Sequence, residues 1–141
     1  MPPPSPAPVA AVSTDQAGLQ ALLDPLAKSP VECDGMTRLV ATVLAENGIA
    51  YQGYCGRISV GNRTMAPHFW IEVGPWRIDY RSKMWFPGEN GIQEGVFLAN
   101  QGEITRGNGT DTRYDGIAVD IAPLPRFLFD VLQIPMLPQT R

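Results

Sequence analysis

The sequence predicts an α+β fold in which N-terminal helices pack on an antiparallel sheet. Up to residue 48, apolar side chains recur at intervals of three and four residues, which is the period of a helix. From residue 49 onward the apolar runs become strand-like, and Gly61-Asn62 and Gly74-Pro75 separate them as hairpin turns do. Helices followed by hairpin-connected strands are typical of this class.

The chain has the size of one ordinary domain, with 141 residues, 44% of them hydrophobic and 18% charged. Residues 1–12 hold five of the 14 prolines and no charged side chain. We therefore expect a disordered, proline-rich lead over residues 1–12 and a single domain over residues 13–141. A docking arm for a partner is the alternative interpretation of the lead.

Composition and charge exclude several classes of function. With 11 basic and 14 acidic side chains the net charge is −3, so we expect neither a nucleic-acid partner nor a membrane partner. No apolar run approaches the ~18 residues of a spanning helix, and the first residues lack the pattern of a signal peptide. We expect a cytoplasmic protein, with delivery to another cell left open. One histidine and two cysteines predict no metal site, and nothing in the sequence implies a cofactor.

Two helices are expected at the start of the domain. A stripe of leucines predicts the first helix over residues 14–28, and Ser29 or Pro30 ends it. The second helix has an apolar face with the spacing i, i+3, i+4, i+7, i+8, formed by Met36, Leu39, Val40, Val43 and Leu44. Asn47-Gly48 is a typical signal for the end of this helix.

Strands and loops follow. Strand-like runs cover residues 49–60, 68–73 and 76–81. Residues 82–113 are rich in Gly and Asn and are expected to form long loops, a strand is expected over residues 114–121, and a short helix over residues 124–132.

Cys33, His68 and Asp79 are the candidate catalytic residues. Cys33 lies at the start of the second helix, on the face of Met36, where the helix dipole favours a thiolate. A thiolate that attacks a carbonyl carbon needs an imidazole to hold and return the proton, and His68 is the one histidine.

The second hairpin brings Asp79 to His68. With Gly74-Pro75 as a two-residue turn, Val73 faces Trp76 and His68 faces Arg81. Asp79 then lies diagonally across from His68 on the same face, about 7–8 Å away at Cα. A carboxylate at this distance can orient the imidazole, as in a nucleophile–histidine–acid triad.

The local sequences around these residues resemble the transglutaminase-like core of the papain-fold cysteine enzymes. Four motifs over about residues 30–82 carry the resemblance: CDGMTRLV at residues 33–40, NGIAY at 47–51, HFWIEV at 68–73 and WRID at 76–79. The family has a Cys that starts a helix, a Gly-Ile after it, a strand of the form H-x-W-x-E-V and a strand that ends W-x-x-D. The resemblance implies a papain-like fold with Cys33 as nucleophile, His68 as general base and acid, and Asp79 as the orienting carboxylate. Tyr80 stands where the family usually has a proline.

The start of the second helix decides whether the Cys33 N–H is free. Ser29 to Glu32 form a capping-box pattern with Pro at the first helical position, which would start the helix at Pro30. The family geometry requires a start at about Glu32 or Cys33, so that the Cys33 N–H can stabilise an oxyanion. We expect the later start.

Other residues have both functional and structural interpretations. Trp70 and Trp85 are candidate substrate-binding residues, and a packing role for each is the alternative. Glu72 and Arg77 face one another across the hairpin and are expected to form an ion pair. Cys55 is expected in the core or at a sheet edge.

These observations predict a thiol-dependent acyl-transfer enzyme that acts on amide or peptide bonds of a protein or peptide substrate, most simply a small cysteine peptidase or amidase. One alternative is a non-catalytic interaction protein that retains the fold. Another is a modifier of proteins of the glutamine deamidase or transglutaminase type.

Overall fold

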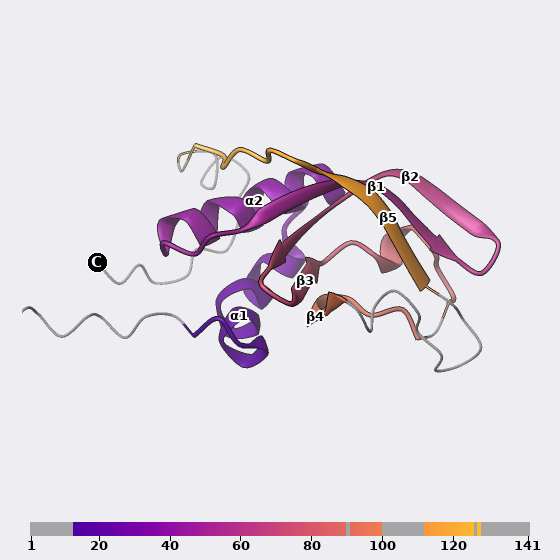
Figure 1. Cartoon of the computed structure of the whole chain (residues 1–141), viewed down its shortest axis with the longest axis horizontal. Helices are drawn as coiled ribbons and strands as arrows, with labels where there is room; N and C mark the ends of the chain where they lie inside the picture. Colours follow the sequence, from indigo (N-terminus) through magenta and orange to yellow (C-terminus); the bar gives the residue numbers. More distant parts are fainter. Residues whose placement is uncertain (1–12, 90, 100–111, 126, 128–141) are drawn as a thin grey trace, which may run out of the picture.

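The computed structural model describes residues 13–89, 91–99, 112–125 and 127, and it shows the predicted α+β class. Two α-helices precede a five-stranded antiparallel sheet (Figure 1). The proline-rich lead expected over residues 1–12 and most of the helix expected over residues 124–132 lie outside the described residues.

The first helical segment is divided in two. Helix α1 spans Gln16–Leu23, and a 3₁₀-helix, η1, spans Asp24–Lys28. Pro25 lacks an N–H and its ring crowds the preceding turn, so the α-helical hydrogen bonds cannot continue through it. The expectation of one helix over residues 14–28 is therefore wrong in its second half. At the other end, Asp15 caps α1 by accepting a hydrogen bond of 2.8 Å from the Gly18 N–H.

Helix α2 spans Cys33–Glu46, followed by Asn47 as its C-cap and by Gly48 with φ of 69°. A positive φ at this position suits glycine, as the Asn47-Gly48 signal predicted. Glu32 is the N-cap and has extended backbone angles, φ of −89° and ψ of −169°. The later of the two possible helix starts is therefore confirmed.

The sheet has the strand order β4-β3-β2-β1-β5. The strands are β1, Gln52–Val60; β2, Arg63–Val73; β3, Trp76–Asp79; β4, Gly95–Leu98; and β5, Thr112–Val119. The register of the second hairpin is confirmed, because Val73 pairs with Trp76 and Glu72 with Arg77.

The structure corrects several strand boundaries. β2 begins at Arg63, five residues before the expected start, because its mostly exposed first part pairs with the end of β1 but shows no apolar alternation. β4 was missed within the expected loops of residues 82–113. It has only four residues, too few to show a period, and it begins at Gly95 with a positive φ of 104°. β3 ends at Asp79 and not at residue 81, so the expected pairing of His68 with Arg81 is absent from the ladder.

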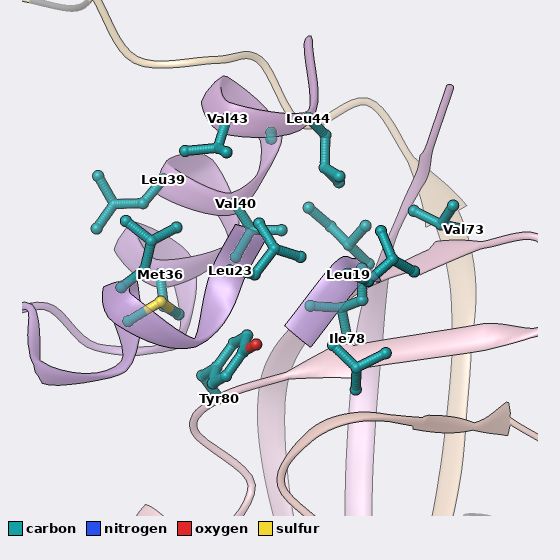
Figure 2. Close-up of a cluster of buried hydrophobic side chains, with 14 of the residues drawn as sticks. Leu19, Leu23, Met36, Leu39, Val40, Val43, Leu44, Val73, Ile78 and Tyr80 are labelled. Carbon is teal, nitrogen blue, oxygen red and sulfur yellow. The ribbon is translucent and has the colours of Figure 1, made fainter. Parts of the chain in front are cut away.

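One core lies between the helices and the sheet. Figure 2 shows Met36 and Val40 of α2 and Leu19 and Leu23 of α1 in one cluster with side chains of β2 and β3. The buried members from the strands are Ile71, Val73, Ile78 and Val96, and Tyr80, the residue after β3, is also buried in this cluster. This packing sets the position of α2, and therefore of Cys33, relative to β2 and β3.

A second cluster contains side chains from β1, β2, β4 and β5, together with Phe86 and Ile92. Its buried members are Ile58, Val60, Trp70, Phe86, Ile92, Phe97 and Tyr114. No helix among the described residues is long and apolar enough to cross a membrane.

Candidate active site

Cys33 is the first residue of α2. Its backbone N–H belongs to the first turn of the helix, where N–H groups have no acceptor within the helix. The capping box is not formed, because the Ser29 hydroxyl is buried without a hydrogen-bond partner. The side chain of Cys33 is nearly buried, with 7% of the residue exposed, and the thiol is free.

His68 and Asp79 form a buried pair. His68 lies on β2 and is 0% exposed, and Asp79 is the last residue of β3. The His68 Nε2–H donates to Asp79 Oδ2 at 2.6 Å. The diagonal placement predicted from the two-residue turn is therefore confirmed by a direct hydrogen bond.

Three donors hold the Asp79 carboxylate. Oδ2 accepts the His68 ring N–H and also the hydroxyl of Tyr114 at 2.7 Å, while Oδ1 accepts the backbone N–H of Arg81 at 2.9 Å. Asp79 is 3% exposed. A carboxylate with this many donors has one orientation, so it also sets the orientation of the His68 ring.

The side chain of Cys33 also interacts with His68, since it contributes to raising the pKa of the ring. Nδ1 of His68, the nitrogen that does not bind Asp79, is buried without a hydrogen-bond partner. Burial has the largest effect on the pKa of His68 and lowers it, but the charge of Asp79, its hydrogen bond and the Cys33 interaction outweigh burial and raise the pKa to about 9. With a pKa of about 9, His68 carries a proton at neutral pH.

Aromatic rings enclose the imidazole. Trp70 stacks beside His68 with ring centroids 6.1 Å apart, and Tyr114 lies 6.2 Å away. The guanidinium of Arg77 lies over the Tyr114 ring at 4.3 Å and over the Trp70 ring at 5.7 Å. Arg77 also forms the predicted ion pair with Glu72, at 2.8 Å.

Gly116 of β5 makes room for the Trp70 ring. A Cβ at this position would lie 2.7 Å from Trp70 Cη2 and 2.6 Å from the Cys55 carbonyl oxygen. Gly116 pairs with Gly56 of β1, which in turn pairs with His68. Because Gly116 has no side chain, the Trp70 ring can lie against β5 beside the His68 imidazole.

The two tryptophans proposed as substrate contacts have different environments. Trp70 is 2% exposed and donates its Nε1–H to Glu72 at 3.2 Å, so its position supports the packing alternative. Trp85 is half-buried at the end of η2 (Lys83–Trp85) and packs against the second cluster. Cys55 is half-buried on β1.

A surface pocket of about 490 Å³ lies near the backbone of His68, although none of the three candidate catalytic residues lines it. Its lining includes Pro67, which precedes His68, and Gly56, which pairs with His68. It is also lined by Cys55, Arg57, Asp115 and Ile117, and Ile117 is 71% exposed. Within the described ranges, no group of three His, Cys, Asp or Glu side chains could hold a metal ion.

Two residues of the site were missed by sequence reasoning. Tyr114 is 35 residues from Asp79, and its place depends on the pairing of β5 with β1, for which the sequence holds no turn signal. Arg81 was expected to face His68 across the hairpin, whereas its side chain binds the segment before Cys33.

The chain matches no protein-family model, no curated protein and no solved structure. The chemical interpretation of the site therefore depends on its own geometry. A buried thiol at a helix N-terminus, a protonated imidazole beside it and a fixed carboxylate behind the imidazole can together perform nucleophilic catalysis.

Proposed function

We propose that this protein is a thiol-dependent acyl-transfer enzyme with a transglutaminase-like core of the papain-fold type. The observation that carries the proposal is the buried hydrogen bond of 2.6 Å between His68 and Asp79, together with the interaction of Cys33 that helps to raise the pKa of His68. The position of Cys33 at the first turn of α2 supports the same assignment, since the helix dipole and the imidazolium both favour the thiolate.

In the proposed reaction the Cys33 thiolate attacks the carbonyl carbon of an amide. The carbonyl oxygen takes the negative charge, and the Cys33 N–H at the start of α2 can donate a hydrogen bond to it. His68 then gives its proton to the departing amine, and the acyl group remains on the sulfur as a thioester. Asp79 keeps the ring oriented and stabilises its charge.

A second nucleophile completes the reaction. Water, deprotonated by His68, would hydrolyse the thioester and release a carboxylic acid, as in a peptidase or amidase. An amine in the place of water would form a new amide, as in a transferase. Both outcomes regenerate the Cys33 thiolate and the protonated ring.

A protein or peptide is the proposed substrate. The pocket beside His68 is open to solvent and presents the exposed aliphatic side chain of Ile117. Pro67 and Gly56 place this pocket next to the backbone of His68, and in the proposed complex a substrate residue near the reacting carbonyl occupies it. Apolar contact with Ile117 would then add to binding.

Selective alkylation tests the proposal, because the chain contains an internal control. Cys55 is half-buried and Cys33 nearly buried, so exposure alone would make Cys55 the faster of the two to react. We expect iodoacetamide at pH 7 to label Cys33 at least about tenfold faster than Cys55, as judged by peptide mass spectrometry. His68→Ala should remove this preference, and a peptide acyl-electrophile should label wild type but not Cys33→Ser.

The burial of Cys33 favours a second candidate, a non-catalytic interaction protein with the same fold. In that case the thiol is a packing group, and Cys55 reacts faster than Cys33. Slow labelling of Cys33 that does not respond to His68→Ala would support this candidate and exclude the enzyme.

A further inference from the structure

The side chain of Arg81 joins the end of β3 to the segment that leads into α2. Its Nε–H donates to the Val31 carbonyl at 2.8 Å, and one terminal nitrogen donates to the Ser29 carbonyl at 2.8 Å. The other terminal nitrogen donates to the carbonyl of Tyr80 at 2.7 Å. All three acceptors are backbone carbonyl oxygens, so Arg81 holds the backbone in place and does not depend on the rotamer of another side chain.

The backbone of Arg81 contacts the other half of the candidate site. Its N–H donates to Asp79 Oδ1 at 2.9 Å. The same residue therefore binds the carboxylate that orients His68 and, through its guanidinium, residues two and four positions before Cys33. Among the described residues, Arg81 provides the side-chain hydrogen bonds that connect residues 29–32 with the end of β3.

We propose that Arg81 is a positioning residue that sets the distance between the Cys33 sulfur and the His68 ring. This inference rests on the proposed function. His68 and Asp79 are held by strands β2 and β3, whereas Cys33 belongs to α2, and the interface between helix and sheet consists of apolar side chains, whose contacts are not directional. The bonds from the planar guanidinium of Arg81 to two carbonyls are directional, and they add to the packing by fixing the segment just before Cys33.

A small change in the distance between the Cys33 sulfur and the His68 ring is expected to change the reaction rate greatly. A displacement of about 1 Å from the productive geometry can reduce a rate about 100-fold. Tyr80 assists from the other side, because its hydroxyl donates to Asp24 Oδ1 at 2.5 Å and so joins the end of β3 to η1. The two residues after Asp79 thus bind two different segments of the helical layer.

The test compares Arg81→Met, Arg81→Lys and Arg38→Met with wild type. Arg38 is the matched control, because it lies on α2 itself and also donates to a backbone carbonyl, that of Ala122 at 3.3 Å, away from Asp79. For each variant the thermal midpoint, the rate of Cys33 alkylation from pH 5 to 10 and the NMR titration midpoint of the one histidine are measured.

We expect Arg81→Met to slow the alkylation of Cys33 by about 10- to 100-fold and to lower the titration midpoint of His68. The direction of this shift separates positioning from simple loss of charge. Removal of a nearby cation would raise the midpoint, whereas withdrawal of Cys33, which helps to raise the pKa of the ring, would lower it. Arg81→Lys keeps one donor and should recover part of the rate, and Arg38→Met should match wild type in both measurements.

Two results would overturn the inference. One is an Arg81→Met protein that melts at a lower temperature but retains the wild-type alkylation profile and His68 midpoint. The other is an Arg81→Met midpoint that moves upward. If Arg81→Met does not fold, the Arg81→Lys variant tests the inference instead. A wild-type alkylation profile in Arg81→Lys would show that the two hydrogen bonds to Val31 and Ser29 are not needed to position Cys33. Failure of the proposed function has a different result, since wild type itself would then show no preferred labelling of Cys33.

Discussion

Tyr114 donates its hydroxyl to Asp79 at 2.7 Å, and this bond joins the edge strand β5 to the end of β3 across the second cluster. The tyrosine binds the same carboxylate oxygen as His68. The orientation of the imidazole therefore depends on a residue of a strand that supplies none of the three proposed catalytic groups.

Tyr114→Phe should weaken both the fold and the site. Oδ2 of Asp79 would lose one of its two donors in a buried place, which should lower the free energy of unfolding by about 1–3 kcal/mol. Cys33 alkylation should slow by several-fold, because the carboxylate then orients His68 less firmly. Urea unfolding and the labelling rate measure the two effects. Tyr54→Phe is the control, since Tyr54 stacks on Trp70 with ring centroids 5.7 Å apart; equal effects of the two variants would contradict the assigned role.

The raised pKa of His68 can be measured directly, because the chain has one histidine and its NMR signals are unambiguous. We expect a midpoint near 9 in wild type, where Asp79 and Cys33 favour the charged ring. In Asp79→Asn the main favourable charge is gone and burial remains, so the midpoint should fall below the ordinary 6.5. A wild-type midpoint at or below 6.5 would refute the buried ion pair.

Stability should fall as the pH rises through the His68 transition. The pKa is raised in the folded state from 6.5 to about 9, so the folded protein binds the proton more tightly than the unfolded chain. The contribution of the charged ring is therefore complete below about pH 6.5 and is lost toward pH 9. Between those limits the difference in unfolding free energy between wild type and His68→Gln should shrink by about 2–3 kcal/mol. A difference that stays constant with pH would contradict this account.

Ile117→Ser should separate substrate binding from thiol reactivity. Ile117 is 71% exposed, so its replacement should change stability by no more than about 0.5 kcal/mol. Iodoacetamide should label Cys33 at the wild-type rate, whereas a peptide acyl-electrophile with an aliphatic residue beside its carbonyl should react more slowly. Equal rates with the peptide probe would show that the pocket does not bind substrate.

The parts of the fold that depend on local signals could be predicted from the sequence. A two-residue turn at Gly74-Pro75 sets the register of β2 and β3, and with it the placement of His68 beside Asp79. Similarly, Asn47-Gly48 marks the end of α2. Each of these features is determined within about a dozen residues, so a periodic pattern and a turn signal suffice.

The remaining parts depend on contacts between distant segments. β4 is too short to show a period, and its assignment requires its pairing with β3. The pairing of β5 with β1 brings Tyr114 to the site. Arg81 binds two backbone carbonyls that lie 50 and 52 residues away along the chain. The local capping signal at Ser29 is not used, and the carbonyl of Ser29 accepts a hydrogen bond from the distant Arg81.

The absence of a side chain at Gly116 has a consequence for natural and laboratory variation. Gly116 lies on the exposed edge strand, where substitutions are usually tolerated. Even Gly116→Ala would press a methyl group against the Trp70 indole and the Cys55 carbonyl. In a saturation-mutagenesis library selected for Cys33 reactivity, position 116 should therefore tolerate as few different amino acids as a core position, although Gly116 itself is exposed.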